Sequence, residues 1–161
     1  MNFAASFLSV SFLAIATALV LPVEVSADDK GKAMRHGRMK KMTCAGCHGM
    51  TGNGAKRDGQ LVAPAYGDSV ILKTNPEMLA LIILKGISSE GSNYSGAMNG
   101  LEKIYNDHDL ASVMTFVRNR WGGHDDYITD EQAAAWRAKY ADRTTPVTQA
   151  ELEESRKSAS P

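Results

Sequence analysis

The sequence predicts an all-α domain of four or five short helices joined by long glycine-rich loops. Three observations favour this fold class. Several segments carry apolar residues at helical spacing behind recognisable N-terminal caps. Glycine and other turn-forming residues cluster between those segments. No stretch of useful length alternates apolar and polar residues with the period of two that a half-buried strand requires.

The predicted helices share a capping residue at the start and a glycine or polar stop at the end. In chain order they cover residues 30–42, 76–85, 110–121 and 129–140, and a last segment behind Thr148. Their predicted caps are Asn75 followed by Pro76, Asp107 or Asp109, Thr129 with Gln132, and Thr148 with Glu151. The helix at 76–85 is apolar almost all round and is expected to be buried. The tail, Ser155 to Pro161, is predicted to be disordered.

A Cys-x-x-Cys-His run, Cys44-Ala45-Gly46-Cys47-His48, is the most informative motif. Two thiols separated by two residues can each add to one vinyl group of a porphyrin, and the imidazole that follows lies where it can bind iron. This pattern is typical of the attachment site of a c-type haem. The sequence therefore predicts one covalent haem c, with Cys44 and Cys47 as its attachment points and His48 as the proximal iron ligand.

The same cysteines allow other interpretations: a thioredoxin-like redox pair, a structural disulfide, or half of a zinc site. The chain has only these two cysteines, so no second Cys-x-x-Cys completes a four-thiolate zinc site. The spacings of its four histidines match no familiar zinc finger. A dithiol oxidoreductase is expected to carry the pair after an apolar strand, whereas a polar, basic segment precedes Cys44. Haem is the preferred interpretation, followed by the redox pair or disulfide and then zinc.

Two further residues are candidates for the haem site. Pro64 supplies a carbonyl that can accept the Nδ1 proton of His48 and leave Nε2 free for iron, although an ordinary loop proline is the alternative. Met98 lies 50 residues after His48, in a segment rich in Gly, Ser and Asn that we expect to be flexible. Because a methionine there has no core to fill, Met98 is the predicted distal iron ligand. His108 and His124 are its competitors.

Residues 1–27 predict export. A mostly apolar run, Phe3 to Leu21, is followed by Val25-Ser26-Ala27, whose small or short side chains suit a signal-peptide cleavage site after Ala27. The run is also long enough for an uncleaved membrane anchor, and no Lys or Arg precedes it. Export to the periplasm agrees with covalent haem, which is normally attached outside the cytoplasmic membrane. Anchoring to the membrane by the uncleaved segment is the alternative.

Three motifs, CAGCHG at 44–49, VAPAY at 62–66 and YSGAM at 94–98, resemble those of class I cytochromes c over about residues 30–121. The segment 109–122, which ends in Arg-Asn-x-Trp-Gly, resembles the last cytochrome helix of quinoprotein-type sugar and alcohol dehydrogenases. The resemblance implies a cytochrome c domain at 28–124 and a C-terminal extension with one more helix and the disordered tail at 125–161.

Two positions differ from the pattern of that family. A proline usually follows the ligating methionine, whereas Asn99 follows Met98, so we expect a less rigid loop. An aromatic residue is common about four residues before the first cysteine, where this chain has Lys40. Met39 and Met42 are the candidates to replace it in the packing between the first and last cytochrome helices.

The resemblance implies electron transfer without a catalytic residue. The implied donor is a PQQ-type (quinoprotein) or molybdenum-type dehydrogenase or another periplasmic donor, and the implied acceptor is a terminal oxidase or another cytochrome of a respiratory chain. The formal net charge is zero, and nothing in its distribution indicates a nucleic-acid partner. One alternative is a haem enzyme or gas-binding protein whose distal position is open or labile. Another is a structural subunit that mainly docks a dehydrogenase.

Overall fold

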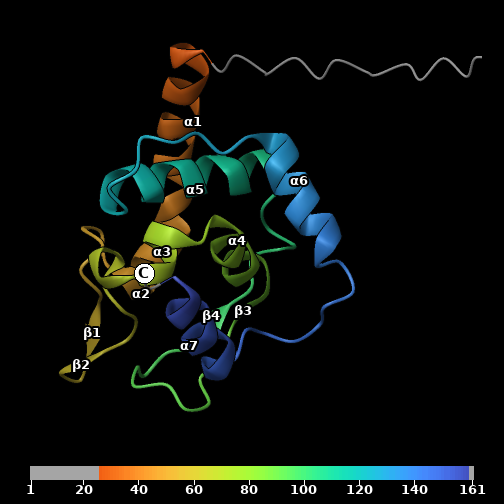
Figure 1. Cartoon of the computed structure of the whole chain (residues 1–161). Helices are drawn as coiled ribbons and strands as arrows, with labels where there is room; N and C mark the ends of the chain where they lie inside the picture. The colour runs from red at the N-terminus through yellow and green to blue at the C-terminus, as the bar shows by residue number, and fades with distance from the viewer. Residues whose placement is uncertain (1–25, 160–161) are drawn as a thin grey trace, which may run out of the picture.

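The computed structural model describes residues 26–159 and confirms an all-α fold (Figure 1). All of the predicted N-terminal leader except Ser26 and Ala27 lies outside these residues. The helices are α1 (Ala27–Lys40), α2 (Ala45–His48), α3 (Val70–Thr74), α4 (Pro76–Lys85), α5 (Asp107–Trp121), α6 (Asp130–Lys139) and α7 (Gln149–Ser158), with 3-10 turns at Lys41–Cys44 and Tyr66–Asp68. Strands β1 (Lys56–Arg57) and β2 (Gln60–Leu61) form one antiparallel ladder, and β3 (Gly86–Ile87) and β4 (Met98–Asn99) form another. Within 26–159, no helix combines the length and apolar character needed to cross a membrane.

Helices α1 and α5 cross at close range (Figure 1). Gly37 makes this possible, because a Cβ atom at that position would lie only 2.0 Å from the carbonyl oxygen of Ser112 on α5. The predicted replacements for the missing aromatic residue are wrong, since Met39 and Met42 are 64% and 53% exposed. The buried face of α5 has the helical spacing that the sequence predicts. It includes Leu110, Val113, Met114 and Val117. Other residues of α5 are buried as well, namely Asp109, Ala111, Ser112, Thr115 and Arg118.

Helix α4 lies at the centre of the core. Asn75 caps it by accepting a hydrogen bond from the backbone N–H of Met78 at 2.9 Å, and Pro76 opens its first turn, as predicted. Every side chain from Leu79 to Leu84 is buried. The helix ends at Gly86, which adopts a φ of 81°. Helix α4 therefore supplies hydrocarbon on all sides, as its composition predicts.

Some helix boundaries differ from the predicted ones. Helix α1 begins before residue 30, because Ser26 caps it by accepting a hydrogen bond from the N–H of Asp29 at 3.1 Å. The cap of α5 is Asn106, and Asp109 is its partner in a capping box. Helix α3 was not predicted, since five residues are too few to show a helical period.

The C-terminal region is more ordered than predicted. The capping boxes at Thr129 and Thr148 are confirmed, and they start α6 and α7. Helix α7 continues to Ser158, and Ser155 is buried. The prediction of disorder is therefore wrong for Ser155–Ser158, because the packing of α7 against distant segments outweighs its polar composition. Residues 125–159 contain both α6 and α7, the two segments that these capping boxes predict.

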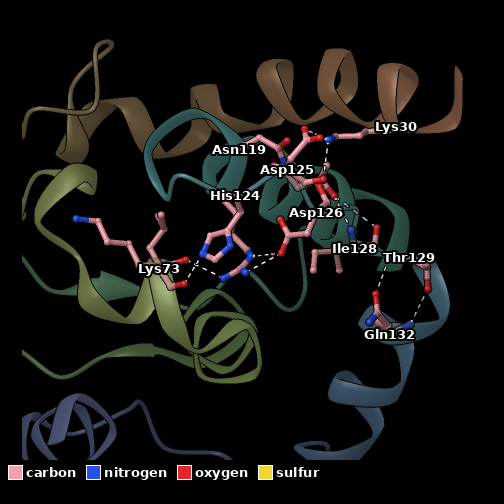
Figure 2. Close-up of polar contacts among 12 residues, drawn as sticks. Lys30, Lys73, Asn119, His124, Asp125, Asp126, Ile128, Thr129 and Gln132 are labelled. Carbon is pink, nitrogen blue, oxygen red and sulfur yellow. Dashed lines mark hydrogen bonds and ion pairs between the residues drawn. The ribbon is translucent and has the colours of Figure 1, made fainter. Parts of the chain in front are cut away.

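The segment between α5 and α6 is tied to other elements by polar contacts (Figure 2). Arg118, near the end of α5, donates to the carbonyl oxygen of Leu72 at 2.8 Å and to the carboxylate of Asp126 at 2.6 and 2.8 Å. His124 contacts the carbonyl oxygen of Lys73. The Arg-Asn-x-Trp-Gly run therefore holds the end of α5 against α3, and its side chains stabilise the fold.

Candidate cofactor site

Both cysteines lie just after the crossing of α1 and α5. Cys44 ends the 3-10 turn, and Cys47 lies in the short helix α2, so the two thiols follow one continuous helical path. Both thiols are free, and Cys47 is exposed. Burial raises the pKa of the Cys44 thiol. A redox pair of the thioredoxin type depends on a lowered thiol pKa, so this environment does not favour the dithiol interpretation.

His48 is held with one ring nitrogen engaged. Its Nδ1 lies 3.0 Å from the carbonyl oxygen of Pro64 and donates to it, which leaves Nε2 as the nitrogen with a free lone pair. The ring stacks on Tyr66, with 4.5 Å between ring centroids and 15° between planes. Burial lowers the pKa of His48, which favours the neutral imidazole that a metal ligand requires. The hydrogen bond to Pro64 therefore orients the ring and leaves Nε2 available to a metal.

The loop after His48 is folded tightly against the same region. The N–H of Gly54 donates to the carbonyl oxygen of His48 at 2.9 Å, and that of Ala55 donates to the carbonyl oxygen of Cys47 at 2.8 Å. At Gly52, a Cβ atom would lie 2.8 Å from ring atoms of Tyr66 and of Trp121. Glycine at this position allows the loop to close against the aromatic rings.

A cavity of about 370 Å³ brings the predicted site residues together. It adjoins a second cavity of about 110 Å³, and the two share several lining residues. The smaller cavity is walled mainly by aliphatic side chains of α3, α4 and α5. The predicted residues that line the larger one are Cys44, Cys47, His48, Pro64 and Met98.

Met98 is held by a β ladder and does not lie in a flexible loop. Ile87 pairs with Met98, and Gly86 pairs with Asn99. The preceding turn is also fixed, since the N–H of Gly96 donates to the carbonyl oxygen of Val62 at 3.2 Å. The ladder fixes the backbone at both Met98 and Asn99. Two residues per strand are too few to show a strand period, so the sequence did not reveal it.

Comparison with known proteins identifies the family. The family model for cytochrome c matches residues 31–121, which include most of α1, the Cys-x-x-Cys-His run, the β3–β4 ladder and α5. The chain belongs to the cytochrome c family. A cytochrome c domain implies covalent haem c, and the two cysteines of this cytochrome are positioned as in its attachment motif.

Two curated relatives share 33% identity with this cytochrome over 82 residues. They are cytochrome c subunits of alcohol dehydrogenase (quinone), from Gluconacetobacter polyoxogenes and Komagataeibacter europaeus. The alignment covers 49% of this chain but only 17% of each relative. The likeness supports electron transfer as the task of the shared domain.

The residues of this cytochrome fit a haem c. Cys44, Cys47, His48 and Met98 line one cavity, and aliphatic side chains line the smaller cavity beside it. That donor set suits thioether attachment and axial ligation of haem iron. Among residues 26–159, no group of three or more His, Cys, Asp or Glu side chains is arranged to hold another metal ion.

The competing histidines lie outside the cavity. His108 contacts the carboxylate of Asp130 at 3.1 Å, and its ring lies 4.7 Å from that of His36. His124 contacts the carbonyl oxygen of Lys73. Neither His108 nor His124 lines the cavity that holds His48. Met98 is therefore the candidate distal ligand that this geometry favours.

Sequence reasoning missed several residues that shape the site. Lys41 is 4% exposed, donates to the carbonyl oxygen of Gly49 at 3.3 Å and lies 5.4 Å from the ring centroid of Trp121. In the sequence, Lys41 is one of several basic residues in a run that is expected to be solvated. Nothing in the local sequence therefore indicates that its side chain is buried. Leu152 and Arg156 of α7 also line both cavities. The capping box at Thr148 predicted their helix but not its position.

Proposed function

We propose that this cytochrome is a periplasmic carrier of single electrons that uses one covalent haem c. Cys44 and Cys47 would attach the haem, and His48 and Met98 would bind its iron. When bound, such a haem supplies one-electron chemistry by cycling between ferric and ferrous iron. The observation that carries this proposal is the single cavity lined by Cys44, Cys47, His48 and Met98.

The protein residues orient the ligands and exclude water. The carbonyl oxygen of Pro64 accepts a hydrogen bond from Nδ1–H of His48, so Nε2 would be the nitrogen that binds the metal. The β3–β4 ladder fixes the backbone of Met98. The aliphatic side chains of α4 and α5 line the smaller cavity and lower the local dielectric around the iron. A thioether ligand in such surroundings favours the reduced state and hence a comparatively high potential.

We further propose that the electron comes from a dehydrogenase and passes to a respiratory acceptor, such as a terminal oxidase or another cytochrome. The two relatives are subunits of a quinone-linked alcohol dehydrogenase by name, which supports a donor of that broad class. Export through the leader at residues 1–27 places carrier and donor in the same compartment. A donor gives one electron to the carrier, and the acceptor removes the same electron.

The first test asks whether Met98 is an iron ligand. Met98→Ala, matured in a host with a c-haem assembly system, should retain covalent haem but lose the weak long-wavelength absorption band of ferric iron bound to a thioether. The measurement is the visible and near-infrared spectrum in both oxidation states, beside a pyridine haemochrome assay that counts haems. Met78→Ala is the matched control, since Met78 packs against the core on α4 and lines neither cavity.

The outcomes separate the carrier from its alternatives. An unchanged band in Met98→Ala removes Met98 from the site. A wild-type protein that is high-spin in the ferric state and binds cyanide rapidly has an open or labile distal position, as expected of a peroxidase-like or gas-binding protein. Wild-type protein without covalent haem from a competent host contradicts the whole proposal.

A further inference from the structure

Lys41 is a buried lysine between the end of α1 and the haem attachment motif. It lies in the 3-10 turn, three residues before Cys44, and it is 4% exposed. Ala33, Gly37 and Lys41 follow each other at the helical spacing of four, and all three are buried. Lys41 therefore extends the face of α1 that packs against α5, and its ammonium group is held inside the protein.

Within residues 26–159, neutral groups bind the ammonium group of Lys41, and no carboxylate forms an ion pair with it. The group donates to the carbonyl oxygen of Gly49 at 3.3 Å and to that of Met50. It also lies 5.4 Å from the ring centroid of Trp121, and the face of an indole ring attracts a cation. These contacts hold the ammonium group in place but leave its positive charge uncompensated.

Two other basic side chains with comparably low exposure are paired. The side chains of Lys85 and Arg118 are 6% and 5% exposed, and they form ion pairs with Glu102 and Asp126. A buried charge without a counter-ion is costly. An apolar side chain at position 41 would pack at the same place without that cost, so the unpaired cation points to a function.

The contacts of Lys41 lead directly to the proposed iron ligand His48. Gly49 follows His48 in the chain. The ring of Trp121 lies 4.9 Å from that of Tyr66, measured between centroids, and Tyr66 in turn stacks on the ring of His48. The positive charge is therefore fixed beside the segment that carries the attachment motif.

The charge of Lys41 also acts on that motif. Burial raises the pKa of the Cys44 thiol, and the charge of Lys41 partly opposes that rise. An ion held near the same thiol would experience the same positive potential. Reduction by one electron from the donor removes one positive charge from iron, so a fixed cation nearby repels the ferric state more than the ferrous state.

We propose that the buried, unpaired charge of Lys41 shifts the redox equilibrium of the haem iron towards the ferrous state. The proposal deepens the function proposed above and rests on it, since it requires the haem. It assigns a role in electron transfer to a residue that lines neither cavity. Because Lys41 is buried, salt screens its charge much less than the charge of a surface residue.

The first variant is Lys41→Gln, which removes the charge but keeps an N–H donor for the loop carbonyls. Its matched control is Arg120→Gln, since Arg120 is exposed and its guanidinium group lies 5.5 Å from the ring centroid of the same Trp121. Spectroelectrochemical titration of the haem-loaded proteins measures the ratio of reduced to oxidised haem at a fixed potential. Lys41→Gln should lower that ratio by about threefold or more. At about 0.5 M salt this effect should persist, whereas any effect of Arg120→Gln should be lost.

Two further variants separate charge from shape. Lys41→Arg retains the charge and should keep the wild-type ratio within about twofold. Lys41→Met has a similar length but neither charge nor donor, and it should lower the ratio as Lys41→Gln does. If one of the two neutral variants does not mature, the other decides. The visible spectrum of each variant shows whether the iron ligation is unchanged.

Two outcomes overturn the proposal. One is a wild-type ratio in the haem-loaded neutral variants. The other is an equal loss in Lys41→Arg, which would mean that the shape of the loop and not the charge of Lys41 affects the iron. Failure of the proposed function is seen separately, as absence of covalent haem in the wild-type protein.

Discussion

Asp109 is a buried carboxylate that joins two helices. It is 5% exposed at the start of α5, and its Oδ1 lies 2.7 Å from Nε2 of His36 and 2.9 Å from Nζ of Lys40, both on α1. Burial by itself raises the pKa of this carboxyl, but the hydrogen bonds from His36 and Lys40 outweigh burial and leave the pKa below its ordinary value. The ionised carboxylate therefore stabilises the fold.

Asp109→Asn should lower the free energy of unfolding of the haem-loaded protein by about 1 to 3 kcal/mol at neutral pH. Because the folded-state pKa lies below the ordinary value of 3.8, this contribution is fully present above that pH and is lost as the pH falls through the folded-state pKa. Chemical denaturation at neutral and acidic pH measures the difference between the two proteins. This difference in the free energy of unfolding should be smaller at acidic pH.

Asp28→Asn is the matched control, because Asp28 forms an exposed ion pair with Lys32 on the same helix, α1. Exposed pairs contribute little, so this variant should unfold like the wild type at both pH values. An Asp109→Asn protein as stable as the wild type at neutral pH contradicts a stabilising role for the buried carboxylate.

At the scale of single residues, the sequence predicted those site residues that belong to a short local motif. Cys44, Cys47 and His48 form a motif whose spacing is short, and one cavity holds them together with Met98. Arg156 was missed because the segments that surround it are distant in sequence. Its position depends on tertiary contacts that no local pattern encodes.

The crossing of α1 and α5 is the main contact between elements. Its geometry depends on Gly37, where an added Cβ atom would lie 2.0 Å from the carbonyl oxygen of Ser112. The backbone of Ser112 cannot move away from an added Cβ atom as easily as a flexible side chain could. The sequence predicted both helices, but the small residue at their contact carries no periodic signal of its own.

Gly37→Ala should therefore force the two helices apart and lower the free energy of unfolding by at least about 2 kcal/mol, in spite of the better helix propensity of alanine. Gly31→Ala is the control in the same helix, because an added Cβ atom there meets only the side chain of Arg35, at 3.6 Å. That variant should gain up to about 1 kcal/mol. Thermal unfolding of both haem-loaded proteins measures the contrast. Equal effects of the two substitutions would show that the crossing tolerates a wider separation.

At the scale of the whole molecule, capped and periodic segments were enough to predict an all-α fold. They were not enough to predict how the C-terminal extension returns to the centre. Helix α7 lines the same cavity as His48 and Met98 because Val147 pairs with β3. That pairing joins segments about 60 residues apart, and such non-local contacts leave no pattern in either segment.

The aliphatic side chains beside the site have a consequence for stability that can be tested. They come from α3, α4 and α5 and line the smaller cavity, next to the residues that would hold the haem. Burying such side chains against a bound macrocycle contributes on the order of several kcal/mol, which is a large part of the folding stability of a small domain. The cofactor is thus expected to serve as a major part of the hydrophobic core.

Replacing both Cys44 and Cys47 by Ala should therefore give a haem-free chain without a cooperative unfolding transition. Near-ultraviolet circular dichroism should lose its fixed aromatic signals, while part of the helical far-ultraviolet signal persists, because helix caps act locally but packing requires the filled cavity. Met98→Ala is the matched control, since it removes one side chain from the same cavity but keeps both thioether bonds and should still unfold cooperatively. A haem-free double variant that melts at the wild-type temperature would mean that side chains alone form a sufficient core.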